Sequence, residues 1–154
     1  MLKRIAIGLV LSCLLGLPLW PAQAPAQGGL WETYTAAGDK AYHKGNYPEA
    51  EKQWVAAFTE AEGFEPQDPR LATSLNNLGE VYRLQRRYAA AEPQHKRALA
   101  IREKVLDSEH PDVAQSLENY AALLRKTGRG NEAAWMETRA KAIRTKHAEQ
   151  NPTK

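Results

Sequence analysis

The sequence predicts an all-α fold, an α-solenoid of three tandem helix-turn-helix repeats, and three observations support this prediction. Apolar and small residues recur at a shift of 42 residues, and a weaker copy lies 41 residues upstream. The apolar residues follow spacings of 3 and 4, which is the period of a helix. No stretch shows the strict alternation that is typical of a strand. Units of this length cannot bury their apolar faces alone, so they stack on one another.

The recurrence is clearest between the second and third units. Its members are Leu71, Leu75, Asn77, Leu78, Ala91 and Ala98, which return as Val113, Leu117, Asn119, Tyr120, Ala133 and Ala140. The first unit matches them with Leu30, Tyr34, Ala36, Ala37, Ala50 and Ala57. We therefore expect repeats at about 30–70, 71–112 and 113–152, which together make a domain of residues 27–150.

The breaks between the apolar runs define the expected helices. Asp68-Pro69 and His110-Pro111 stand 42 residues apart and open the second and third units, because Pro suits a first helical turn. Gly45-Asn46 and Gly128-Arg129-Gly130 indicate turns between helices. We expect helices near 31–44, 47–62, 70–86, 88–107, 112–127 and 130–148. Pro93 lies deep enough in the fourth helix to bend it.

The first residues are typical of a secretory signal peptide. Lys3 and Arg4 precede an apolar run, Ile5 to Trp20, that is shorter than the roughly 20 residues a membrane-spanning helix needs. Ala24-Pro25-Ala26 then fits the small-x-small cleavage rule. Residues 1–26 would be removed and the protein exported, to the periplasm or the medium of a bacterium. A retained membrane anchor is the alternative.

Cys13 is the only cysteine and lies inside this leader. A bacterial lipoprotein box at Val10-Leu11-Ser12-Cys13 is a second interpretation, which would leave the protein membrane-associated, although Leu11 fits that pattern poorly. Cleavage after Ala26 would leave the mature chain without cysteine. Disulfides, thiolate chemistry and Cys-based metal sites are then excluded.

Composition and motifs argue against several functional classes. The chain has 21 basic and 18 acidic residues, and loss of Lys3 and Arg4 leaves 19 against 18, so bulk charge gives no reason to expect nucleic acid. The four histidines do not pair at metal-ligand spacing. No nucleophile elbow, phosphate-binding glycine loop or haem motif occurs. We expect no enzyme, no metal and no small-molecule cofactor.

The residues carry a family resemblance over almost all of 30–150. The second unit reads Asn77-Leu78-Gly79, then Tyr82, Tyr88, Ala91 and Ala98, and continues into Ile101-Arg102-Glu103 and His110-Pro111-Asp112. It resembles the tetratricopeptide repeat, in the kinesin light chain-like subclass whose units have 42 residues. The third unit departs from this pattern, since Gly130 replaces the Tyr and Lys141 the Leu.

Packing explains most of the shared residues. Gly38, Gly79 and Ala121 are expected where the two helices of a unit approach most closely, so that their side chains must be small. Ala50, Ala91 and Ala133 are expected to do the same from the second helix of each unit. Trp31, Trp54 and Trp135 are expected to pack between repeats rather than to anchor an interface.

The resemblance implies that the first helix of each unit lines a concave peptide-binding groove. Asn77 and Asn119 match the groove asparagine that holds a peptide backbone, and a carboxamide can both donate and accept. The other candidates on this face are Asn76, Thr73, Glu80, Arg83, Gln115, Arg125 and Tyr42. Arg83, Arg125 and Lys126 are expected to make one end basic, and Glu32 with Asp39 the other end acidic. A solvated face without a ligand is the alternative.

We therefore expect a non-enzymatic protein–protein interaction module that binds an extended segment of a partner protein in its groove. The alternative is a self-associating structural or assembly protein of the cell envelope, a homo-oligomer that uses its exposed end repeats.

Overall fold

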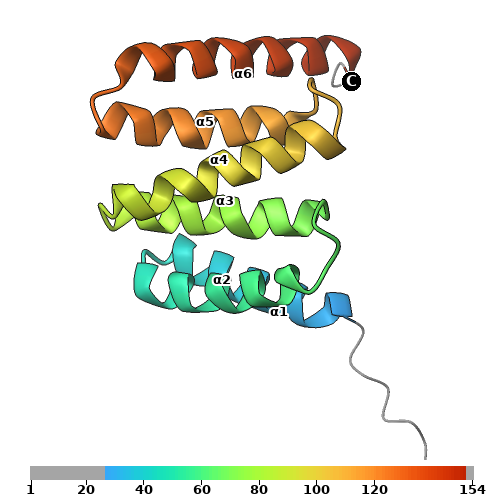
Figure 1. Cartoon of the computed structure of the whole chain (residues 1–154), viewed down its shortest axis with the longest axis vertical. Coiled ribbons are helices and arrows are strands. Elements are labelled where there is room, and N and C mark those ends of the chain that lie inside the picture. The colour runs from blue at the N-terminus through green and yellow to red at the C-terminus, as the bar shows by residue number, and fades with distance from the viewer. Residues whose placement is uncertain (1–26, 152–154) are drawn as a thin grey trace, which may run out of the picture.

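The computed structural model describes residues 27–151 and shows a stack of six helices (Figure 1). Helices α1 (Gln27–His43) and α2 (Tyr47–Glu62) form the first pair, α3 (Pro69–Leu84) and α4 (Tyr88–Val105) the second, and α5 (Pro111–Lys126) and α6 (Gly130–Gln150) the third. The predicted all-α solenoid of helix-turn-helix repeats is confirmed. The expected leader, with Cys13 and the cleavage site, lies outside the described residues.

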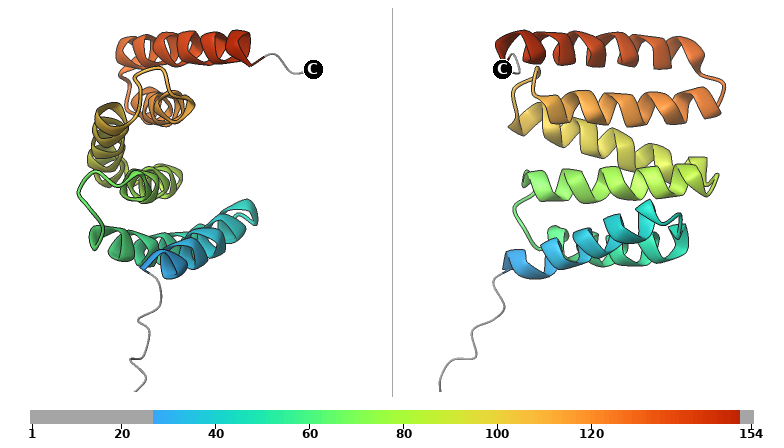
Figure 2. Two further views of the ribbon diagram at one scale, coloured as in Figure 1. Left: turned by 90° about the vertical axis from the view of Figure 1, so that its right-hand side faces the viewer. Right: turned by 180° about the vertical axis from the view of Figure 1, so that it is seen from behind.

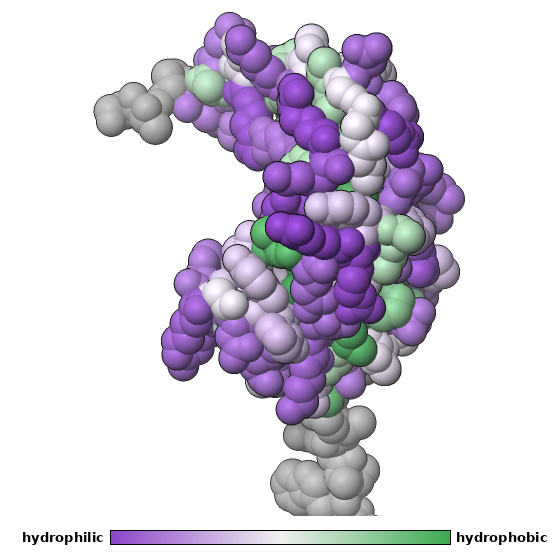
Figure 3. All heavy atoms as spheres, turned by 90° about the vertical axis from the view of Figure 1, so that its left-hand side faces the viewer, coloured by the Kyte–Doolittle hydropathy of each residue, from purple (hydrophilic) through white to green (hydrophobic). Residues whose placement is uncertain are grey.

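The stack curves into a C (Figure 2). Helices α1, α3 and α5 lie on the inner, concave side, and α2 and α4 lie on the outer side. A space-filling view shows the hollow between the two ends of the stack (Figure 3). Side chains of the inner helices that do not enter the core therefore face this hollow. None of the six described helices combines the length and the hydropathy needed to cross a membrane.

Helices α3 and α5 begin at capped prolines, within one residue of the predicted starts. The Asp68 carboxylate accepts a hydrogen bond from the backbone N–H of Arg70 at 2.8 Å, with Pro69 in the first turn. The His110 ring accepts one from the N–H of Asp112 at 3.1 Å. Both caps satisfy a donor that a helix start would otherwise leave unpaired.

Several helix ends differ from expectation. Helix α1 begins at residue 27 rather than 31, and α4 ends at Val105 rather than 107. Helix α3 ends at Leu84 rather than 86, because Arg86 adopts a φ of 61°. Gly45 and Gly128 occupy the same place in the first and third units, with φ of 72° and 78°. The turn thus requires a left-handed residue, and the second unit uses arginine where glycine is less strained.

The core runs between the helix layers and uses the recurring residues. Leu75, Leu117, Ala91 and Ala133 have no exposed surface, and Tyr120 is only 4% exposed. The first unit is more open, since Leu30 is 37% exposed. In the second and third units the recurring residues other than Asn77 and Asn119 are therefore packing positions.

Gly38 and Gly79 each admit a bulky side chain from the next helix. A Cβ on Gly79 would lie 2.6–2.8 Å from three atoms of the His95 ring, and one on Gly38 would lie 2.3 Å from the Trp54 indole. Real Cβ atoms do not approach other atoms so closely. This confirms the predicted need for a small residue here and shows that it makes room for a ring rather than for backbone.

The tryptophans divide into two kinds. Trp54 is 3% exposed, and the Trp31 indole N–H donates to Ser74 Oγ at 2.8 Å, so both pack within the stack as expected. The expectation is wrong for Trp135, which is 62% exposed. In the repeat register it replaces Lys52 and Pro93, which also lie at an exposed position.

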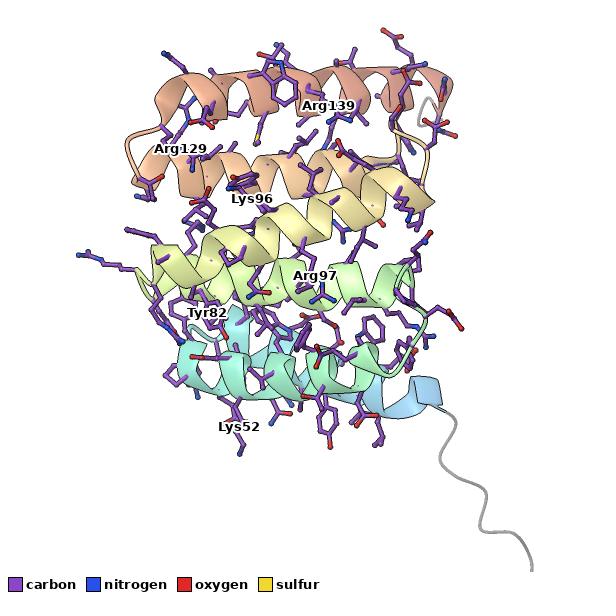
Figure 4. The ribbon with its side chains drawn as sticks, viewed as in Figure 1. Lys52, Tyr82, Lys96, Arg97, Arg129 and Arg139 are labelled. Atoms are coloured by element: carbon purple, nitrogen blue, oxygen red, sulfur yellow. The ribbon has the colours of Figure 1, made fainter. Side chains whose placement is uncertain are left out.

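Ion pairs join successive repeats at the residues that precede α4 and α6; Figure 4 labels one of these residues, Arg129. Glu51 of α2 accepts from Arg87 at 2.6 Å, and Glu92 of α4 accepts from Arg129 at 2.6 Å. The two pairs occupy equivalent positions of successive units. Such half-exposed pairs contribute little energy each, so they orient the repeats more than they stabilise them.

His95 is a buried polar residue whose ring nitrogens make no hydrogen bond to the described residues. Its ring has no exposed surface. It stacks on Tyr120 of α5 with ring centroids 6.2 Å apart. Burial lowers the pKa of His95 to about 4, with the charge of Arg83 acting in the same direction and that of Glu80 against it.

Replacement of Gly79 by Leu is expected to destabilise the protein by about 1–3 kcal/mol, because the new side chain must displace the His95 ring. Thermal unfolding followed by circular dichroism measures the effect. Gly130→Leu is the matched control, since a Cβ at Gly130 meets nothing within 4 Å. An unchanged midpoint for Gly79→Leu would show that this helix contact is not as described.

The stability of the protein is expected to fall as the pH drops from about 6.5 to 5. The unfolded chain binds a proton at His95 near pH 6.5, whereas the folded chain resists it until about pH 4. The free energy of unfolding therefore decreases by about 1.4 kcal/mol per unit, about 2 kcal/mol over this window.

Urea unfolding at several pH values above 5 tests this. Paired carboxylates affect stability only at lower pH. Glu92 is an example, since Lys96 and Arg129 hold its pKa at about 2. The variant His95→Leu should lose the dependence. A wild-type protein equally stable at pH 5 and 6.5 would contradict the assignment.

Candidate functional site

A polar hollow of about 410 Å³ occupies the concave side and is shared by the three inner helices. Seven of the nine predicted site residues line it: Tyr42 from α1, Thr73, Asn76, Asn77 and Glu80 from α3, and Gln115 and Asn119 from α5. On α3 the four are spaced by 3 or 1, so they share the helix face that points away from Leu71, Leu75 and Leu78. One helix therefore buries leucines on one side and presents amides on the other.

The groove asparagines have unused hydrogen-bonding capacity. Asn77 and Asn119 are half-buried at equivalent positions of neighbouring inner helices, and neither side chain bonds to another described residue. Asn76 is only 3% exposed, and its Oδ1 has no partner among the described residues. A buried, unpaired amide oxygen is costly, so a ligand that satisfies it gains affinity.

Arg102 of α4 is a groove residue that our sequence analysis did not select. Its side chain is 4% exposed and reaches from the outer layer into the hollow. It donates to the Asp112 carbonyl at 2.8 Å and to Ser116 Oγ at 2.9 Å, and more weakly to Thr73 Oγ1 at 3.4 Å. None of these acceptors is a carboxylate.

Burial therefore lowers the pKa of the Arg102 guanidinium, and Asp112 counteracts this only partly. A guanidinium has five donors, more than these contacts use. A signal was present in the sequence: Arg102 follows Ala98 by four residues, on the buried side of its helix.

Arg83 and Arg125 do not make the predicted basic end. Arg83 donates twice to Glu80, at 2.8 and 2.6 Å, and this bond raises the pKa of Arg83. Arg125 extends to Glu137 of α6, outside the hollow, and the pair is mostly exposed. Because local carboxylates already neutralise both arginines, the cation that faces the groove is Arg102 instead.

The acidic end forms around Asp39. Its Oδ1 accepts a hydrogen bond from the Trp54 indole N–H at 3.2 Å. The Tyr42 hydroxyl donates to Glu80 Oε1 at 3.3 Å, next to Asp39 in the lining of the hollow. Glu32, the other residue expected here, is exposed and outside the hollow. The groove thus carries a carboxylate near α1 and a guanidinium between α3 and α5.

The lining of the hollow combines several kinds of polar group. It offers amides, hydroxyls, the imidazole of His43, the carboxylates of Asp39 and Glu80, and the guanidinium of Arg102. Among residues 27–151, no three His, Cys, Asp or Glu side chains gather in a way that could hold a metal ion.

A family profile and several solved structures relate the chain to known proteins. The profile of the tetratricopeptide repeat family matches residues 32–104 and 70–146. No curated protein gives a match. Among solved structures, BtubC (BKLC) from P. vanneervenii superposes with a TM-score of 0.68 at 24% identity, over 80% of this chain and 50% of that one.

The kinesin light chain TPR-like repeats of Podosopora anserina superpose with a TM-score of 0.69 at 21% identity, over 75% of this chain and 56% of that one. A point variant of the same protein gives 0.68. The chain spans about half the length of these structures, and identities this low show the fold alone. Since the two matches to the family profile together span residues 32–146, the chain belongs to the tetratricopeptide repeat family.

Proposed function

We propose that this protein is a non-enzymatic interaction module that binds an extended segment of a partner protein along its concave groove. The observation that carries the proposal is the pair Asn77 and Asn119, two unpartnered carboxamides at equivalent positions on adjacent inner helices. Each can accept from a peptide N–H and donate to a peptide C=O. Helices on the order of 10 Å apart match about three residues of extended chain.

Arg102 adds a requirement on the partner. It lies in the hollow with spare donors, and none of its acceptors within the described part of the chain is a carboxylate. A buried guanidinium binds a carboxylate with paired, charge-assisted hydrogen bonds. We therefore expect the bound segment to place an Asp or Glu side chain at this point.

The polar surface of α6, at the end of the stack, argues for partner binding in the groove and against end-to-end self-association. Lys141 stands where α2 and α4 carry Phe58 and Leu99, so a packing position has become charged. Arg144 and Lys146 of the same helix bond back to Glu118 and Glu109. Repeat stacks need such polar outer faces at their ends to stay soluble.

We further propose that the protein acts outside the cytoplasm, either free in the periplasm or the medium or held at a membrane. The support is the sequence of residues 1–26, whose basic start, apolar run and small-residue end resemble a cleaved leader.

The double variant Asn77→Ala, Asn119→Ala is expected to fold normally and to lose partner binding. Two bonds from each amide contribute about 0.5–1.5 kcal/mol apiece, so about 2–6 kcal/mol is at stake. A partner captured by the mature protein from a periplasmic extract would be titrated by calorimetry against both proteins. Asn131→Ala, at an exposed asparagine of α6, is the control. Full affinity in the double variant would exclude the groove as the site.

Exported protein is expected to begin at Gln27, because Ala24 and Ala26 satisfy the cleavage rule. Intact-mass spectrometry of protein recovered from the periplasm measures this. A mass that retains residues 1–26, or that includes a lipid on Cys13, would instead establish a membrane-held form.

A further inference from the structure

We infer that the α1 end of the groove is a subsite for a lysine side chain of the bound segment, formed by Asp39, Thr35 and Asn76. This inference rests on the proposed function and specifies the partner further. Each of these side chains lines the same hollow.

Charge is the first argument. Asp39 takes part in no ion pair among the described residues, and its one recorded bond is the neutral indole donor of Trp54. Glu80, the other carboxylate in the hollow, is already paired with Arg83 at 2.6 Å. This end of the groove therefore keeps one uncompensated negative charge, which favours a cationic ligand.

Hydrogen-bonding capacity is the second argument. Thr35 Oγ1 and Asn76 Oδ1 are buried and have no hydrogen-bond partner within residues 27–151. Asn76 as a whole is 3% exposed and lines the hollow. Together with the free Asp39 oxygen, the end offers three acceptors that lack donors. An ammonium group supplies three donors and no acceptor.

The walls of the subsite also suit a cation. Tyr42 and Trp54 line the hollow beside Asp39, with ring centroids 5.4 Å apart. The half-buried Tyr42 ring can attract an ammonium group and pack against the methylene stem of lysine, whereas Trp54, which is 3% exposed, holds Asp39 in place. The subsite lies between α1 and α3, whereas Arg102 lies between α3 and α5. The bound segment would thus carry Lys and an acidic residue about three residues apart.

The test is an NMR titration of the ¹⁵N-labelled mature protein with N-acetyl-lysine methylamide. The Trp54 indole N–H reports directly, because it donates to Asp39. We expect saturable shifts of this signal and of Asn76, and no such shifts with N-acetyl-norleucine methylamide, which has the same stem without charge. Asp39→Asn should weaken the lysine probe about fivefold. That variant keeps an oxygen for the indole donor.

Two further variants make the result decisive. Glu62→Gln removes an exposed carboxylate that lies outside the hollow, and it should leave the titration unchanged. Thr35→Val removes an acceptor without altering charge and should also weaken the lysine probe, which covers the case in which Asp39→Asn folds poorly. The absence of a saturable shift in the wild type, an equal response to norleucine, or unchanged affinity in Asp39→Asn would overturn the subsite. Any of these would leave the groove itself to be decided by the Asn77 and Asn119 variant.

Discussion

The insertion of one large ring into each of the first two helix pairs is the contact on which the stack depends. In the first pair Trp54 enters opposite Gly38, and in the second His95 enters opposite Gly79. Because the inner helix has no side chain there, the ring fills the space between the two helices. The third pair differs, with Ala121 on α5 and Glu137 at the equivalent position of α6, which pairs with Arg125.

The packing of the helix pairs also determines which side chains of α3 and α5 face the groove. Once the leucine side of α3 is held against α4, its opposite side must face the hollow, and the same holds for α5. The amides of Asn77 and Asn119 therefore come into one row without any contact between them. A binding surface of this kind is rigid before a ligand arrives, which reduces the entropy lost on binding.

Polar groups that cross from one repeat to the next give the groove its charge pattern. Arg102 belongs to the outer layer but is held by Thr73 on one side and Ser116 on the other. Arg83 and Arg125, which lie on the inner helices, are instead neutralised by Glu80 and Glu137. The result is a negative end at Asp39 and a positive point at Arg102, a polarity that would give the proposed bound segment a preferred direction.

The sequence alone determined the number of units, their helices and the residues that pack, because small and apolar side chains must recur wherever identical contacts recur. It also placed Asn77 and Asn119 on equivalent faces of α3 and α5, because the period of 3.6 residues decides which residues share a helix face. Helix ends were less certain, as Arg86 shows, because a left-handed turn does not require glycine.

Only the tertiary structure decided which charges face the groove. Arg83 pairs with Glu80, three residues earlier on its own helix, whereas Arg102 is held at the groove by Thr73 and Ser116, which lie beside it only after the helices pack. The exposure of Trp135 and the unpaired oxygen of Asn76 were likewise invisible, because burial of a given side chain depends on what the neighbouring repeat places against it.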